Sequence, residues 1–435
     1  MARRPSMLGL MSLLCAHIVA SCLSVAYAID HFPGIVAFDD SKIIIAIAIV
    51  APFALVSLLF AIGRFSFGYV VGFYFYTMIL GYLWLVDFSV LTYNHSLAIA
   101  SIFISALTFL VPALFITKPI PQRLPLSIQG FDRLSFAILI LSAAIVVVGA
   151  IYNFKPVDLS KMYEFRAQLD FPLPLRYAIG ISSTVLLPYV FACFLTRRRY
   201  GPAIIPLVLM LFFYPVTLTR LALFAPFWLL FLALLSVLVE TRTAAILSLF
   251  LPISAGVAIV VLTNADMFPA YPGWQYFGTV NSRMIAMPSI ALEVYNNFFA
   301  NHALTHFCQI NVLKHVLACR YDEPLSVVLS KAYPLGAFNA SLFATEGIAS
   351  VGLALAPLSA LACGLVIGLA NRLSSGLSPR FILLSAGLVP QVLLNVPLSV
   401  TLVTNGAAIL FLLWYITPRA LFEDATTGAF AAKSH

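Results

Sequence analysis

Residues 43–63 read IIIAIAIVAPFALVSLLFAIG, a run of 21 residues without a charged side chain. A helix needs about 20 mostly apolar residues to cross the hydrocarbon core of a bilayer, so this run is long enough to span one. The composition of the chain agrees, because 62% of its 435 residues are hydrophobic and only 9% are charged, against about 25% charged in an ordinary soluble chain. The sequence therefore predicts an all-α polytopic membrane protein. It excludes a cytosolic enzyme, a secreted disulfide scaffold and a disordered protein.

Similar apolar stretches recur along the chain and predict a helical bundle of about 12 spans in a single integral membrane domain, residues 1–435. They lie at 7–28, 43–63, 67–90, 96–117, 134–152, 177–196, 202–218, 221–239, 243–263, 345–370, 381–397 and 400–417. The first stretch imitates a secretory signal peptide that ends in Ala26-Tyr27-Ala28. Its apolar run is longer than the roughly 7–15 residues of such a peptide, so we expect an uncleaved span.

The charges are distributed as the positive-inside rule requires. With a cytoplasmic N-terminus, the segments on the inner side hold most of the basic residues and few of the acidic ones. The net charge of +8 is therefore explained by basic cytoplasmic loops, and no nucleic-acid partner is predicted. Both termini are predicted to be cytoplasmic.

Two outward segments are too long to be simple turns: an outer loop at 151–176 and a large, partly helical outer loop at 264–346. Loops much longer than the usual connections between packed helices are commonly functional. Apolar residues recur at helical spacing within 289–307, which predicts a helix lying at the membrane interface. Cys308 and Cys319 share the large loop and could form a disulfide in an oxidising compartment. The six cysteines contain no CxxC pair, so a zinc or haem framework is not expected.

Four arginines on the predicted outer side are candidates for phosphate binding: Arg166, Arg176, Arg220 and Arg283. A guanidinium forms a planar fork that binds phosphate oxygens in bidentate fashion. Arg220 stands between two apolar helices, where it must reach the lipid headgroups or meet an anion. A lipid-phosphate anchor explains Arg220 alone equally well. Together the four fit a lipid-linked pyrophosphate, because fixed cations stabilise the charge that develops on such a leaving group.

Acidic and histidine side chains on the outer side are candidates for a general base. They are Glu164, Glu293, Asp322, Glu323, Glu346, His302 and His306. His302 and His306 have the spacing of one helix face, as a metal site could require, but no third ligand stands at a fixed spacing and no metal is predicted. Tyr295 and its aromatic neighbours could stack on sugar rings or form an interfacial belt. Asn339 and Glu346 are polar enough to act, although the small residues around them also fit close helix packing.

Four segments, in this order and spacing, resemble the Wzy-type O-antigen polymerases, the oligosaccharide repeat-unit polymerase family. They are Tyr163-Glu164-Phe165-Arg166, the stretch from Thr217 to Phe224 around Arg220, the pair Arg283–Pro288 and Tyr295–Asn301, and Phe338-Asn339-Ala340 with Glu346-Gly347 through Gly352. The likeness covers roughly residues 150–375. Arg220 stands where Lys is common in the family. His302 and His306 stand where relatives often carry Pro and an aromatic residue.

The resemblance implies a glycosyltransferase that joins undecaprenyl-pyrophosphate-linked oligosaccharides on the periplasmic face of the bacterial inner membrane. The transfer would be inverting and metal-independent, without a cofactor. We assign the four arginines to the lipid pyrophosphates, and Glu164 or His306 to deprotonation of the acceptor hydroxyl. The residues assigned to the sugar or the acceptor are Tyr163, Tyr295, Asn301, His302, Asn339 and Glu346. The expected partners are the lipid-linked oligosaccharides, membrane lipid and a chain-length regulator protein.

Other classes of membrane protein share parts of this pattern. An O-antigen ligase would have the same architecture, donor and arginines but would transfer to lipid A–core. A GT-C monosaccharide transferase usually carries an acidic pair in its first outer loop, where this chain has Asp30, Asp39 and Asp40. A polysaccharide or lipid transporter would need a polar path through the membrane, and the predicted spans contain almost no charge.

Overall fold

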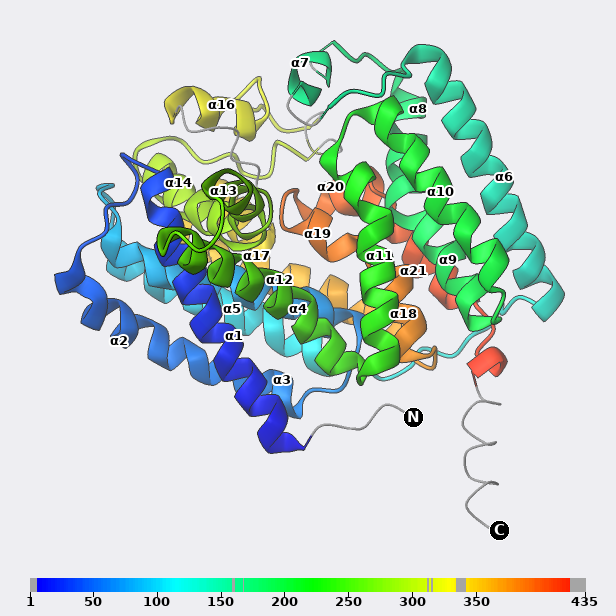
Figure 1. Ribbon diagram of the computed structural model, residues 1–435, viewed down its shortest axis with the longest axis horizontal. Helices are drawn as coiled ribbons and strands as arrows, with labels where there is room; N and C mark the ends of the chain where they lie inside the picture. The colour runs from blue at the N-terminus through cyan, green and yellow to red at the C-terminus, as the bar shows by residue number, and fades with distance from the viewer. Residues whose placement is uncertain are drawn as a thin grey trace. The chain divides into compact units, whose positions relative to one another are not determined.

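The computed structural model describes residues 6–158, 161–166, 168–310, 313, 316–333 and 342–422. These residues form an α-helical structure, and within them the β-structure is one isolated bridge between Val36 and Ser89. The structure confirms the prediction of an all-α polytopic helical bundle (Figure 1).

Ten helical segments in the described part of the chain are long and apolar enough to cross a membrane. They are built from α1 (Met7–Ala28), α2 (Ile43–Ala54) with α3 (Leu58–Ile62), α4 (Phe67–Leu85), α5 (His95–Phe115), α6 (Ile128–Tyr152), α8 (Leu173–Ile181) with α9 (Leu187–Thr196), α10 (Tyr200–Thr217), α11 (Arg220–Leu238), α12 (Thr241–Asn264) and α17 (Leu342–Ser374). They coincide with the first ten apolar stretches of the sequence. The protein is therefore a multi-pass membrane protein.

The last two predicted spans, 381–397 and 400–417, are wrong as single helices. The first contains α18 (Pro379–Ser385) and α19 (Val389–Leu393), and the second contains α20 (Leu398–Val403) and α21 (Ala407–Ile416). The first is interrupted at residues 386–388, between α18 and α19. The second is interrupted before α21, where Gly406 has a φ of 80°, a conformation that favours glycine. Interrupted helices are tolerated at membrane depth where protein covers the freed backbone. Leu388, Val389 and Leu393 are accordingly buried.

The chain divides into two compact units. Unit 1 contains the segment that ends at Ile116, together with Arg242–Gly368 and Leu393–Ser399. Unit 2 contains Thr117–Thr241, Leu369–Val392 and the segment that begins at Val400.

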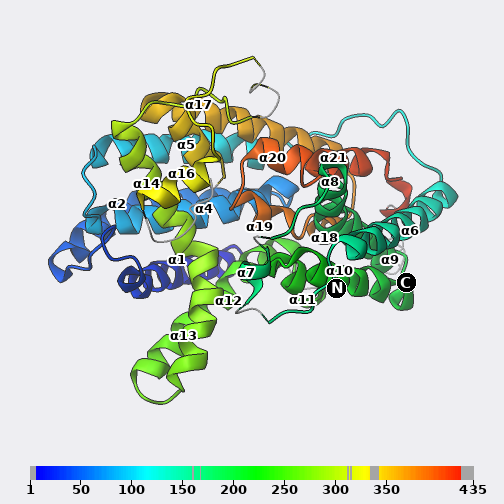
Figure 2. The same ribbon diagram turned by 90° about the horizontal axis from the view of Figure 1, so that it is seen from above.

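Helix α4 forms the centre of unit 1. Nearly all of its residues are buried, as expected for a helix that is hydrophobic on every side. It contacts α1, α2 and α5, and the ring of Phe53 on α2 stacks on Tyr76 of α4 at 5.0 Å. Helices α5 and α17 lie side by side (Figure 2), because Gly364 leaves no room for a Cβ: one placed there would lie 2.6 Å from the Phe109 carbonyl oxygen.

Unit 2 is built around α9, which contacts α6, α10 and α18, while α10 also packs on α11 (Figure 1). Two tryptophans fix the interrupted C-terminal segment. Trp228 donates its indole N–H to the Gly387 carbonyl at 3.0 Å, and Trp414 donates to the Ser385 hydroxyl at 2.9 Å. The hydrogen bonds satisfy buried polar groups that would otherwise oppose placing Trp in an apolar core.

Loops that the sequence assigns to one side of the membrane bond to one another within each unit. On the predicted inner side of unit 2, the Ile120 amide donates to the Arg372 carbonyl, and Arg419 donates to the Ile120 carbonyl at 3.0 Å. On the predicted outer side of unit 1, the Val90 amide donates to the Ile35 carbonyl at 2.9 Å. These contacts agree with the predicted alternation of the spans. Which side faces the cytoplasm stays a prediction.

Candidate functional site

The large outer loop folds into helices that continue into the core of unit 1. It contains α13 (Ala270–Thr279), a π-helical turn at Ser282–Ala286, α14 (Met287–Asn301) and α16 (Leu325–Ala332). Helix α14 is buried along almost its whole length and contacts α4. It is therefore a core helix, and not the interfacial helix that the apolar spacing predicts.

The polar residues of α14 explain this difference, because they find partners inside the protein. The Ser289 hydroxyl packs against Gly81 of α4, where a Cβ would approach it to 2.3 Å. The Asn296 amide donates to the Tyr82 hydroxyl at 3.0 Å. From the sequence pattern, such polar residues are expected on the solvent-facing side of the helix. In the structure they line the contact between two helices.

A buried carboxyl stands at the centre of these polar contacts. Tyr93 donates its hydroxyl to Glu293 Oε2 at 2.6 Å, and the hydroxyls of Tyr93 and Tyr82 are 3.2 Å apart. Helix α14 is not among the ten candidate spans. Burial raises the pKa of Glu293 to about 7, opposed by the hydrogen bonds of Tyr93 and Ser89. The Glu293 side chain is fully buried, so in this structure it contacts protein groups and is closed to a ligand at the surface.

The two histidines of the loop do not share a helix face, because α14 ends at Asn301. His302 is exposed, and its ring stacks on Phe298 at 3.9 Å while its Nδ1 lies 2.8 Å from the Phe298 carbonyl oxygen. His306 is also exposed and has a φ of 49°. Within the described residues, no three His, Cys, Asp or Glu side chains come together as a metal site would require.

The segment around His306 is fastened to the start of α17. The amides of Thr305 and His306 donate to the carbonyls of Ala349 and Ser350 at 2.8 and 3.1 Å. These carbonyls are available because Gly352, with a φ of 77°, interrupts the helical hydrogen-bond ladder. Cys308 and Cys319 form a disulfide in the same loop, with 5.2 Å between their Cα atoms. The imidazole of His306 is thus held on a fixed backbone at the surface of unit 1.

We expect the disulfide to be detectable by thiol labelling. In wild-type cells an impermeant maleimide should leave Cys308 and Cys319 unlabelled until a reductant is added. Cys308→Ser should free the Cys319 thiol, and the opened loop should be cut faster by protease because a constraint of roughly 3 kcal/mol is lost. Cys193→Ser, at a buried free cysteine, is the matched control. Labelling of the wild-type pair without reductant would contradict the expectation.

The four predicted arginines are divided between the two units. Arg283 lies in the π-helical turn of unit 1 and is exposed. Unit 2 holds Arg166 on the short helix α7 (Met162–Arg166), Arg176 on α8 and Arg220 at the start of α11. Arg176 lies 3.8 Å from the Asp170 carboxylate, with both side chains largely exposed. Among the described residues, neither Arg166 nor Arg283 forms an ion pair or a hydrogen bond through its guanidinium.

The segment that carries Arg166 is tied to the turn that carries Arg220. Asn153, at the end of α6, donates its amide to the carbonyls of Pro215 and Val216, each at 2.9 Å. Lys155 donates its backbone N–H to the Pro215 carbonyl at 3.0 Å, and its ammonium lies 5.2 Å from the centre of the Phe165 ring on α7. The sequence order alone does not show this connection. These hydrogen bonds place the segment of Arg166 and the turn of Arg220 at the same end of α10.

The sugar-binding candidates have different surroundings. Tyr295 is fully buried. Its burial raises the pKa of the hydroxyl most, and the nearby Glu346 carboxylate raises it further. In the structure as it stands, Tyr295 is therefore part of the core, and its stacking on a sugar ring would require a rearrangement. Asn301 is exposed and donates to the Asn297 carbonyl at 3.3 Å. The side chain of Tyr163 and all of Asn339 lie outside the described residues.

Comparisons with models of protein families, with curated proteins and with solved structures find no match. The class of protein therefore follows from the fold and the site alone. It is a multi-pass helical membrane protein that presents exposed arginines on the folded segments of two long loops.

Proposed function

We propose that the protein is a glycosyltransferase of the bacterial inner membrane that polymerises undecaprenyl-pyrophosphate-linked oligosaccharide units, as in O-antigen or a related surface polysaccharide. The exposed guanidiniums of Arg166 and Arg283 carry this proposal. Among the described residues neither has an anionic partner, in a chain with only 9% charged residues. Such groups suit a phosphate ligand, to which arginine makes strong charge-assisted hydrogen bonds.

The proposed reaction is a single displacement with inversion. A hydroxyl oxygen of the acceptor's non-reducing sugar attacks the anomeric carbon of the donor chain. The bond between that carbon and the pyrophosphate oxygen breaks, and the lipid pyrophosphate leaves with the electron pair. We assign Arg166, Arg176, Arg220 and Arg283 to the two lipid pyrophosphates, and the arginines on the donor's pyrophosphate would stabilise the negative charge that develops as it leaves.

The proton of the acceptor hydroxyl needs a base at the surface. Glu164 on α7 and His306, two residues before Cys308, are both exposed, so each could reach a bound sugar. Exposed His302 and Asn301 would supply hydrogen bonds to the acceptor. A chain-length regulator protein is the proposed protein partner. The lipid-linked oligosaccharides are the proposed substrates.

Deleting the gene and complementing it tests the proposal. Surface polysaccharide is then resolved by length on a gel. We expect the long-chain ladder to disappear while a single repeat unit stays attached to the lipid A–core. Loss of every repeat unit from the core would indicate a ligase instead. Accumulation of lipid-linked units on the cytoplasmic leaflet would indicate a transporter, and an unchanged ladder would exclude all three.

A further inference from the structure

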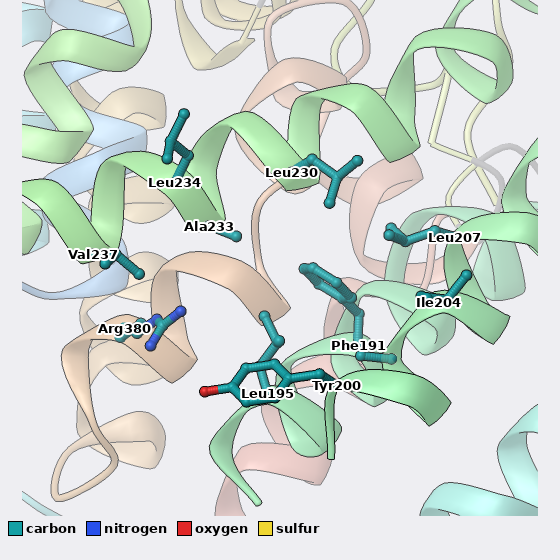
Figure 3. Close-up of a pocket in the computed structure, with 11 residues that line it drawn as sticks. Phe191, Leu195, Tyr200, Ile204, Leu207, Leu230, Ala233, Leu234, Val237 and Arg380 are labelled. Atoms are coloured by element: carbon teal, nitrogen blue, oxygen red, sulfur yellow. The ribbon is translucent and has the colours of Figure 1, made fainter. Parts of the chain in front are cut away.

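Unit 2 contains an apolar groove of about 430 Å³ that is formed by α9, α10, α11 and α18. Aliphatic and aromatic side chains line it, and Arg380 is the one charged residue among them (Figure 3). The apolar side chains of the lining include Phe191, Leu207, Leu230, Ala233 and Leu234. Its size falls within the range of small-molecule pockets, roughly 300–1,000 Å³.

The groove opens on the lipid-facing surface of unit 2. Tyr200 at one wall is 64% exposed, and Leu234 and Val237 at the other are each 57% exposed. In a helical membrane protein such exposed apolar side chains meet hydrocarbon. A ligand of this groove must therefore be able to enter from the membrane, and its buried part must be an apolar chain.

The ends of the lining helices set the depth of the groove. Leu195 stands near the end of α9, Tyr200 at the start of α10, Val237 near the end of α11 and Arg380 near the start of α18. All four lie beside loops that the sequence assigns to the cytoplasmic side. The arginine thus marks the level of the headgroups of the inner leaflet, while the rest of the groove runs toward the hydrocarbon.

Basic residues lie near this end of the groove, together with the acidic Glu240 just past the end of α11. Arg380 donates its Nε–H to the Ser236 hydroxyl at 3.1 Å, which orients the guanidinium. In the adjoining turn, Arg197 and Arg199 share a single carboxylate, Asp132, at 3.5 and 3.2 Å. One acid for two cations leaves an excess of positive charge. The cytoplasmic leaflet carries anionic lipids that basic residues near the surface attract.

We propose that this groove binds an anionic phospholipid of the cytoplasmic leaflet, with one acyl chain along α10 and α11 and the phosphate on Arg380. The apolar lining and the single cation at its boundary end match the two parts of such a lipid. The proposal is independent of the polymerase function, because the proposed substrates are used at the opposite side of the membrane.

Native mass spectrometry of the purified full-length protein tests the proposal. The delipidated protein is titrated with phosphatidylglycerol and, separately, with phosphatidylcholine. We expect the first phosphatidylglycerol to bind about tenfold more tightly. Both lipids carry a phosphate, but the choline ammonium cancels the net charge of phosphatidylcholine. Arg380→Gln removes the cation that responds to net charge, so it should remove most of this tenfold preference, which corresponds to about 1.4 kcal/mol. Arg133→Gln, at an exposed arginine outside the groove, should behave as wild type.

Filling the groove provides a second, charge-neutral test. Ala233→Phe should weaken the binding of both lipids at the high-affinity site. If that variant does not fold, Val237→Phe on the same wall should have the same effect. Ala144→Phe, on the exposed side of α6, is the matched control and should change nothing. Equal binding of the two lipids to wild type, an unchanged preference in Arg380→Gln, or selective retention of a polyprenyl phosphate would each overturn the proposal.

Discussion

Replacing Arg283 with Ala is expected to abolish long polysaccharide chains, leaving one repeat unit on the acceptor. Its guanidinium is exposed in a π-helical turn, and we assign it to the pyrophosphate of a lipid-linked substrate. Removing one fixed donor from a charge-stabilised transition state costs on the order of 10²–10³-fold in rate. Arg166→Ala on α7 should have an effect of similar size. The measurement is the length distribution of surface polysaccharide in a deletion strain that carries each variant.

Two further variants make this result specific. Arg283→Lys keeps the charge but loses the planar fork, so it should restore chains only in part. Arg133→Ala removes an exposed arginine of the predicted cytoplasmic side and should leave the ladder unchanged. Equal amounts of each variant in the membrane are verified by immunoblot. Normal long chains from both Arg166→Ala and Arg283→Ala would refute the assignment of these arginines and the proposed polymerase with it.

Hydropathy predicts the long spans well because each needs only an uninterrupted apolar composition. It fails at the C-terminal pair, where the turn at residues 386–388 and the turn before Gly406 interrupt the helices without making the sequence less apolar. The apolar composition of a segment predicts only that the segment can lie in lipid. Whether it is one helix depends on backbone groups that neighbouring helices must satisfy.

The candidate site shows a similar division between local and long-range information. Exposed Arg166 and Glu164 could be anticipated from their place in a polar loop. The bond from Asn153 to the end of α10 joins residues more than sixty positions apart, and no local pattern announces it. The prediction that His302 and His306 share a helix face is wrong for another reason: their spacing fits a helix face, but α14 ends one residue before His302.

The sequence places Glu293 among the acids of the outer side because it lies in the large loop. Its partner Tyr93 is 200 positions away in the sequence, so only the folded structure shows that the carboxyl is a buried core group. The available sequence signal was the apolar surroundings of this single acid, in PSIALEVYNNFF. A lone carboxyl in such a run needs an internal hydrogen-bond donor.

The buried carboxyl leads to the second large expected effect, a pH-dependent stability that Glu293→Gln removes. The folded-state pKa of Glu293 is about 7, against about 4.3 in an unfolded chain. Below pH 4 the carboxyl is protonated in both states, and its burial carries no ionic cost. As the pH rises from 4 to 7, only the unfolded state loses the proton readily, so the folded state loses about 1.4 kcal/mol per pH unit. Above pH 7 this loss of folding free energy is constant, at roughly 4 kcal/mol.

Glutamine keeps the acceptor for the Tyr93 hydroxyl but cannot ionise. Glu293→Gln should therefore equal the wild type in melting temperature near pH 4.5 and exceed it at pH 8, measured on the purified protein in detergent. Glu293→Ala removes the acceptor and strands the Tyr93 hydroxyl, which costs about 1–3 kcal/mol at every pH. Asp322→Asn, at an exposed carboxyl, is the matched control and should follow the wild type. Parallel melting curves for wild type and Glu293→Gln across this pH range would show that the carboxyl is not held neutral by its burial.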